Sequence, residues 1–155
     1  MLRLSKLGDY ATVIMARLAR EPERSYSAVE MARAIGIAAP TVSKLLKTLA
    51  RAGLLVSQRG ARGGYALARP PAAISLAQVI DAVEGPPGIT ECGVEEGLCI
   101  HEGACEVRRN WQRVNRVIRD ALEGISLREF AQPVVRTAEV AVHPVPRRRA
   151  TDCLF

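Results

Sequence analysis

Three of the four cysteines in this chain, Cys92, Cys99 and Cys105, lie within fourteen residues of one another. Their spacing, C-x6-C-x5-C, is wider than the C-x2-C pairs typical of zinc ribbons and bacterial ferredoxins. Glycines at positions 93, 97 and 103 would allow a loop to wrap around a small group. Because thiolates are the usual ligands of iron–sulfur clusters, the pattern favours such a cluster, of the [2Fe-2S] or [4Fe-4S] type, over a zinc site or three unliganded redox thiols.

The chain has no sequence feature of secretion or membrane insertion. Its first residues lead directly into an amphipathic pattern, and no apolar stretch approaches the roughly 18 to 20 residues that a bilayer requires. We therefore expect a cytoplasmic location and no membrane partner, in which case clustered cysteines act as ligands or redox thiols and not as disulfides. The remaining cysteine, Cys153, has no partner motif and is not expected to be a ligand.

Positive charge is concentrated in the first half of the chain. Residues 1–75 carry twelve Lys and Arg against four Asp and Glu, a net +8, whereas residues 76–155 carry ten against twelve, a net −2. The cysteine segment is acidic, with six glutamates and no Lys or Arg from Glu84 to Glu106. This distribution favours double-stranded DNA as the partner of the first half.

A helix-turn-helix pattern lies within the basic half. Ser27 and Glu30 form a potential capping box for one helix, which carries Val29, and Gly36 ends it. The next helix opens near Pro40, and the short turn with its glycine has helix-turn-helix spacing. In this second helix the predicted buried stripe is Val42, Leu45, Leu46 and Leu49. The residues predicted to face DNA are Pro40, Thr41, Ser43, Lys44 and Lys47.

A basic hairpin follows the helix-turn-helix. Residues 54–59 have the pattern of a strand, 60–64 form a glycine-rich tip, and 65–68 return as a second strand. Arg59 and Arg62 lie at this tip, and basic tips of this kind commonly enter the minor groove. We predict that both arginines contact DNA; the alternative is that they are solvent-facing turn residues.

Two further helices complete the prediction. Ser5 caps a first helix that ends near Ala19 and carries Asp9 one turn in. A long helix runs from Cys105 to about Glu123, with a narrow apolar seam that resembles a coiled-coil contact. The seam consists of Val107, Trp111, Val114, Ile118 and Leu122. It predicts homodimerisation, although packing on its own domain is an alternative that does not exclude a dimer.

The predicted fold is mainly α with a small β-hairpin wing: a winged helix-turn-helix followed by a long C-terminal dimerisation helix. Residues 1–84 form the DNA-binding domain, including a short linking helix at 75–84. Residues 85–106 form the cysteine loop for cluster binding, and 105–131 form the dimerisation helix with a short terminal helix. Residues 132–155 are expected to be a flexible tail, because helical periodicity fails there.

This combination resembles the winged-helix family of bacterial iron–sulfur transcription regulators that includes the IscR and NsrR types, and within it the regulators of the SUF cluster-assembly system. The resemblance covers residues 1 to about 131 and rests on segments 2–11, 40–46, 59–65 and 110–112 together with the three cysteines. It implies a homodimer, a cluster held by the three cysteines near the dimer helix, and promoter binding that depends on the state of the cluster.

The IscR and NsrR types of this family use different residues as the fourth cluster ligand. In the IscR type it is a histidine three residues beyond the last cysteine, where this chain has Arg108, which cannot ligate. In the NsrR type it is an aspartate from the first helix of the partner subunit, and Asp9 matches that position. We therefore expect Asp9 to be the fourth ligand. His101 is the main alternative, followed by water, a small thiol or Glu102.

The predicted function is a dimeric, cluster-sensing transcription regulator that binds promoter DNA and controls SUF cluster assembly or iron- and redox-response genes, as a repressor or an activator. We do not expect an enzyme, because neither of the two histidines, His101 and His143, belongs to a recognisable Ser-His or Cys-His pair. The alternative function is a cluster-free winged-helix regulator that uses redox thiols, a small-molecule ligand or a partner protein.

Overall fold

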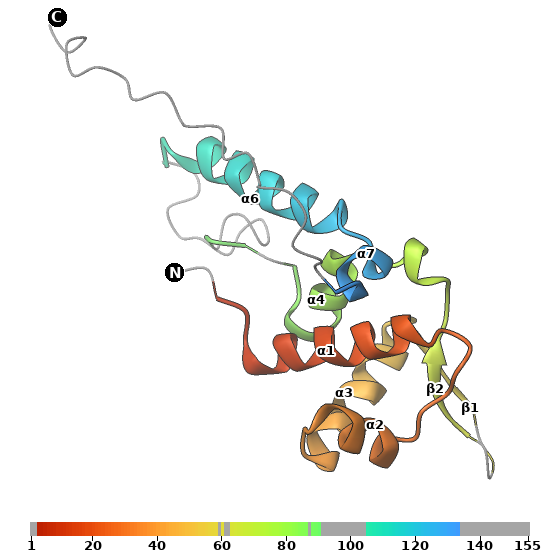
Figure 1. The fold of residues 1–155 in the computed structure, drawn as a ribbon. Helices are drawn as coiled ribbons and strands as arrows, with labels where there is room; N and C mark the ends of the chain where they lie inside the picture. The colour runs from red at the N-terminus through yellow and green to blue at the C-terminus, as the bar shows by residue number, and fades with distance from the viewer. Residues whose placement is uncertain (1–2, 59, 61–62, 87, 91–104, 134–155) are drawn as a thin grey trace, which may run out of the picture.

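The structure, a computed structural model, describes residues 3–58, 60, 63–86, 88–90 and 105–133. Its elements in chain order are α1 (Lys6–Arg20), α2 (Ala28–Ile35), α3 (Ala39–Arg51), β1 (Leu55–Gln58), β2 (Gly64–Leu67), the 3-10 turn η1 (Pro71–Ala73), α4 (Leu76–Glu84), α6 (Arg108–Glu123) and α7 (Leu127–Ala131) (Figure 1). This mostly helical chain with one antiparallel hairpin confirms the predicted fold class.

Serine caps fix the starts of four helices. Ser5, Ser27, Ser75 and Ser126 each accept a hydrogen bond from a backbone N–H in the first turn of the helix that follows. At Ser27, Ser75 and Ser126 the residue three positions later returns the bond, which completes a capping box. At the other end of α2, Gly36 has a φ of 70°, which a side chain would make costly. The helix boundaries are therefore written into the local sequence.

The core lies where α1 crosses between two layers. In Figure 1, α2 and α3 lie on one side of α1, and α4 and α7 lie on the other. The predicted stripe of α3 is buried as expected, together with side chains of α1 and α2. Val29 is an exception, because it projects outward from α2 and is exposed. Among the described residues, the largest fully buried side chains are Ile14, Met15, Leu18, Tyr26, Met31, Val42, Leu46, Leu49, Ile74, Val79 and Leu127.

The hairpin is attached to the helical core through Tyr26. β1 and β2 pair in register from Leu55 opposite Leu67 to Gln58 opposite Gly64. Tyr26, between α1 and α2, exchanges two backbone hydrogen bonds with Tyr65 of β2, with N···O distances of 3.0 and 2.8 Å. A Cβ atom at Gly64 would lie 2.7 Å from the carbonyl carbon and oxygen of Tyr26, so only glycine permits this approach. The orientation of the wing is thus set by the α1–α2 connection.

The C-terminal part returns to the body at a second backbone bridge. α6 begins at Arg108, three residues later than predicted, because residues 105–107 form a turn in which the Arg108 N–H donates to the Cys105 carbonyl at 3.3 Å. After α6, Leu76 N donates to Ile125 O at 2.9 Å and Leu127 N donates to Ile74 O at 2.7 Å. This Ser75–Ser126 bridge holds the starts of α4 and α7 together. None of the helices in the described ranges is long and apolar enough to cross a membrane.

Candidate functional site

The outward face of α3 carries the residues predicted to read DNA. Pro40, Lys44 and Lys47 are exposed, while Thr41 and Ser43 are half-buried. Pro40 lies in the first turn, which contains no acidic residue and receives no side-chain cap from Ala38. The positive end of the α3 dipole and the two lysines therefore add to each other, which suits a phosphate backbone. Arg59 and Arg62 lie outside the described residues.

A cluster of polar side chains beside the hairpin was not foreseen from the sequence. The Glu21 carboxylate accepts hydrogen bonds from Arg17 Nη2 at 2.6 Å, Arg24 Nη1 at 3.0 Å and the Tyr26 hydroxyl at 2.8 Å. The Arg24 guanidinium also lies 4.4 Å from the centre of the Tyr26 ring. The Tyr26 hydroxyl and then Arg24 are the main causes that lower the pKa of Glu21. The cluster fixes the one loop residue that holds the wing.

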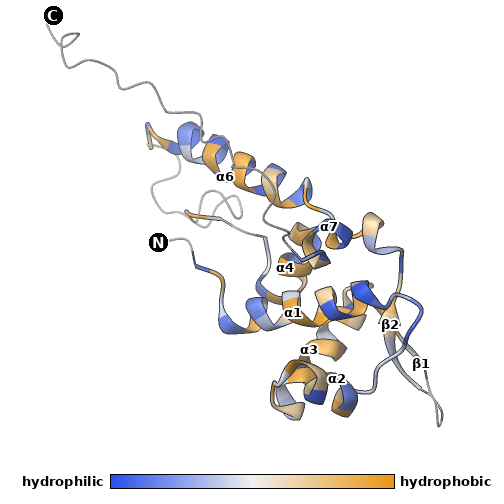
Figure 2. Ribbon diagram, in the orientation of Figure 1, coloured by the Kyte–Doolittle hydropathy of each residue, from blue (hydrophilic) through white to orange (hydrophobic). Residues whose placement is uncertain are grey.

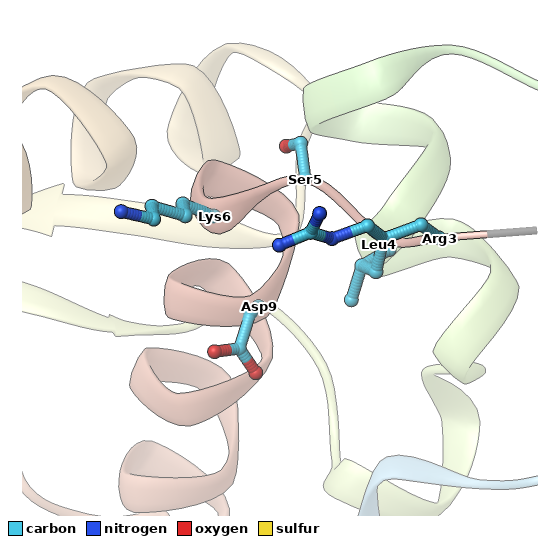
Figure 3. Close-up of a pocket in the computed structure, with 5 residues that line it drawn as sticks. All are labelled: Arg3, Leu4, Ser5, Lys6 and Asp9. Carbon is cyan, nitrogen blue, oxygen red and sulfur yellow. The ribbon is translucent and has the colours of Figure 1, made fainter.

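Asp9, the expected fourth ligand, is exposed on α1. Together with Arg3, Leu4, Ser5 and Lys6 it lines a pocket at the start of the helix (Figure 3). Figure 3 shows these five side chains around the first turn of α1, with the Asp9 carboxylate one turn further along the helix than Ser5. The Asp9 carboxylate is therefore accessible to a group that approaches from outside the protomer.

Asp9 also borders a larger pocket that adjoins the cysteine segment. This pocket, of about 530 Å³, lies among α1, α4, α6 and α7 and includes Gly88, Ile118 and Leu122 in its lining. Gly88 lies four residues before Cys92, so the pocket connects Asp9 with the entry to the cysteine loop and with the inner side of α6.

The first turn of α1 is capped by a residue from α4. Ser5 N donates to Glu84 Oε1 at 2.9 Å, a bond that a Glu three residues after the cap makes in an ordinary capping box. In α1 that position is Gly8, and a Cβ atom there would collide with the Glu84 carboxylate. Because Gly8 has no side chain, Glu84 can reach Ser5. The resulting hydrogen bond joins α1, which carries Asp9, to α4, which precedes the cysteine segment.

Only one of the three clustered cysteines lies in the described part of the chain. Cys105 is a free, half-buried thiol directly before α6. Cys92, Cys99, His101 and Glu102 lie outside the described residues. Within the described ranges no group of three or more His, Cys, Asp or Glu could hold a metal ion. As donors, a free Cys105 thiol and an accessible Asp9 carboxylate fit an iron–sulfur cluster held mainly by thiolates.

The residues before the loop are held by α6. Asn115, which is only 5% exposed, accepts a hydrogen bond from Ile89 N at 2.8 Å through Oδ1 and donates to Thr90 Oγ1 at 3.3 Å through Nδ2. Sequence reasoning missed this residue. α6 has two further amides, Asn110 and Gln112, so nothing in the sequence singles out Asn115.

An apolar stripe on α6 remains uncovered in the protomer. Val107, Trp111, Val114 and Val117 are exposed by 50, 38, 41 and 61%. At about 100° per residue they project together, roughly a quarter turn from Asn115, which faces the domain. Ile118 and Leu122 of the predicted seam are half-buried at the large pocket. Figure 2 displays the resulting division of α6 into apolar and polar strips. On the polar side Arg119 bridges Asp81 of α4 at 3.0 Å.

Comparison with known proteins defines the class. Residues 4–133 match the model of the Rrf2 family, described as iron-dependent transcriptional regulators, and the chain belongs to this family. A putative HTH-type transcriptional regulator of Neisseria meningitidis is 33% identical, over 84% of this chain and 88% of its own length.

Two solved structures share the fold and most of the length. The structure of CymR, the global cysteine regulator of B. subtilis, has a TM-score of 0.67 at 31% identity and covers 84% of this chain and 97% of that one. T. potens IscR has a TM-score of 0.67 at 28% identity and covers 89% and 93%. The relatives are transcriptional regulators and not enzymes, so the protein is an Rrf2-type winged-helix regulator.

Proposed function

We propose that the protein is a homodimeric regulator that binds promoter DNA and senses an iron–sulfur cluster held by Cys92, Cys99 and Cys105, with Asp9 of the partner subunit as the fourth ligand. Its targets are genes of cluster assembly (SUF) or of the iron and redox response. The observation that carries the proposal is the presence of three clustered cysteines in a chain with the fold of T. potens IscR.

The DNA-binding part of the proposal rests on α3 and the wing. Lys44 and Lys47 would bind phosphates, Thr41 and Ser43 would face base edges, and the hairpin held by Tyr26 would carry Arg59 and Arg62 to the neighbouring groove. In a dimer the two α3 helices must match half-sites about 34 Å apart on the duplex. A change of a few ångströms in their separation is therefore sufficient to alter affinity.

The regulatory part rests on the contacts between α1, α4 and α6. When bound, the cluster would link the cysteine segment to α1 of the partner subunit through Asp9. Loss of the cluster in iron shortage, or its reaction with oxygen or nitric oxide, would break this link. Three contacts within the protomer would transmit this change. Asn115 of α6 accepts a hydrogen bond from Ile89 N, Arg119 of α6 forms an ion pair with Asp81 of α4, and Glu84 of α4 caps α1 at Ser5. These contacts connect the cysteine segment with α4 and α1, both of which pack on α3.

Anaerobic purification tests the cluster directly. We expect a brown protein with visible absorbance that disappears in a Cys92, Cys99, Cys105→Ala triple variant, and footprints on the promoter region that differ between cluster-loaded and apo protein. A colourless, iron-free protein from anaerobic cells would refute the cluster.

The DNA-binding surface is tested by Lys44→Ala. Loss of a phosphate contact should weaken binding about equally on all sequences and reduce the slope of log K against log salt by about 1. Glu23→Ala removes an exposed charge in the α1–α2 connection and serves as the control. If the Lys44→Ala and Lys47→Ala variants both bind DNA as wild type does, α3 is not the DNA-binding surface.

The fourth ligand is tested by paired substitutions. Asp9→Ala should leave the apo protein folded and make the cluster faster to lose, because Asp9 is exposed and makes no core contact. If His101→Ala accelerates the loss and Asp9→Ala does not, the ligand is in the loop itself.

A second function is favoured by one comparison. The fold and 31% identity are shared with a protein titled a global cysteine regulator. A cluster-free regulator that responds through its thiols would be colourless, and its DNA affinity would change on thiol oxidation and recover with a reductant.

A further inference from the structure

Asn115 is an unusual residue for its position. It lies in the middle of α6, where asparagine is a poor helix former, yet it is nearly fully buried. A residue that only filled space at this point would be apolar. Buried polar side chains are retained where they form hydrogen bonds, so the partners of Asn115 identify its role.

Those partners, Ile89 and Thr90, are the last described residues before Cys92. The Ile89 N–H and the Thr90 hydroxyl oxygen occupy the oxygen and nitrogen ends of the Asn115 amide. The Ile89 side chain is itself 42% exposed, so burial of that side chain contributes little to holding the segment in place. The amide of Asn115 therefore contributes directly to holding residues 89 and 90, through the Ile89 backbone and the Thr90 side chain.

The opposite end of the loop is attached to the same helix. Cys105 directly precedes α6, and its carbonyl accepts from Arg108 N. From Arg108 to Asn115 the helix rises by roughly 10 Å, at about 1.5 Å per residue. Thr90 and Cys105, the described residues on either side of the undescribed range 91–104, are thus both attached to the same helix.

We propose that Asn115 is a positioning residue for the cluster site: it clamps residues 89 and 90, which precede the segment that carries Cys92, to the helix that follows Cys105. This inference rests on the proposed cluster function. It goes beyond the ligand set, because it assigns the loop geometry to a side chain that would not touch the cluster. It also makes α6 the element on which the cluster site and the apolar stripe meet.

The clamp is first tested in apo protein. Asn115→Leu keeps the volume and removes the acceptor, so the Ile89 amide should exchange with deuterium about tenfold faster, a figure that follows from the loss of one buried hydrogen bond. Asn115→Asp keeps an acceptor and should preserve the protection. Gln112→Leu makes the same change of amide to leucine one turn earlier and should leave Ile89 unaffected. Unchanged exchange in a folded Asn115→Leu protein would overturn the inference.

The consequence for the site is tested in loaded protein. Residues that support metal ligands typically change affinity by 10- to 100-fold, so Asn115→Leu should lose the cluster at least about tenfold faster than wild type, and Asn115→Asp should restore slow loss. A similar melting temperature of the apo variants separates this effect from general destabilisation. Equal rates of cluster loss in all variants would refute the positioning role.

Two further outcomes are kept apart by design. If wild-type protein takes up no cluster, the proposed function fails, and the exchange of Ile89 still decides whether the clamp exists. If Asn115→Leu does not fold, Thr90→Val, which replaces the hydroxyl on the other side of the clamp, takes its place and should show an intermediate acceleration of both rates. No acceleration in Thr90→Val would then count against the inference.

Discussion

Glu21 accepts hydrogen bonds from three side chains, and it makes stability depend on pH. Its pKa lies below the usual glutamate value of about 4.3, chiefly because Tyr26 and Arg24 donate hydrogen bonds to it. The ionised form therefore stabilises the fold above that usual value, and this contribution is lost as the pH falls through the lowered pKa.

We predict that Glu21→Gln flattens the acid limb of the stability curve. Melting temperatures measured from pH 6 to pH 3 should fall less steeply in the variant than in wild type. The capping glutamates Glu30 and Glu129, whose pKa values are lowered chiefly by hydrogen bonds from Ser27 and Ser126, remain in both proteins. Glu23→Gln makes the same change of charge at an exposed neighbour. Parallel curves for all three proteins would contradict the role of Glu21.

The residues that the sequence reveals are those whose role is local. Serine caps, Gly36 and the apolar spacing of α3 act within one helix, and each was predictable. Glu84 and Asn115 act on partners in other parts of the chain, and their sequence neighbourhoods carry no sign of it. Val29 fits the periodicity of α2 but is exposed, because α2 buries only Met31 and Ala32.

At the scale of elements, the contact of α1 with α4 depends on the lack of a side chain at Gly8, which leaves room for the Glu84 carboxylate. Gly8→Ala should gain helix propensity, by up to about 1 kcal/mol, and lose the Glu84 cap, which is of similar size. The net change in wild type should therefore be small. In a Glu84→Ala background the same substitution should stabilise, by about 1 kcal/mol.

A double-mutant cycle by urea unfolding measures this difference. Additive effects of Gly8→Ala and Glu84→Ala would show that the two positions do not interact, contrary to the close approach of the Gly8 backbone to the Glu84 carboxylate.

The wing is an element whose placement depends on a single close approach. Gly64→Ala should push β2 away from Tyr26, destabilise the fold by about 1–3 kcal/mol and weaken DNA binding through loss of the hairpin contact. Ser57→Ala, on the exposed strand residue opposite Tyr65, should leave both properties near wild type. Calorimetry and salt-dependent DNA titration check the two effects. Wild-type behaviour of Gly64→Ala in both assays would show that the wing is placed by other contacts.

At the scale of the whole molecule, the apolar stripe of α6 predicts a second protomer. Val114→Glu should place a charge in the interface and shift the protein toward monomer in sedimentation at micromolar concentration, with loss of binding to a two-half-site operator. Arg116→Gln changes the charge by the same amount on the exposed polar side and should remain dimeric. An unshifted Val114→Glu protein would place the interface elsewhere. The sequence predicted the seam but not Val117, because a strict heptad pattern excludes that position.

The Ser75–Ser126 bridge gives the chain the connectivity of an inserted module. The segment between Ile74 and Leu127 begins and ends at one place, where the two crossing points exchange hydrogen bonds, and its first helix, α4, packs in the core of the DNA-binding body. Segments whose ends meet in this way tolerate changes of length and content, as domain insertions do. Variation in the residues between α4 and Ser126 can therefore leave the DNA-binding frame intact, and an engineered chimera that exchanges these residues but keeps α4 should retain the operator of its host.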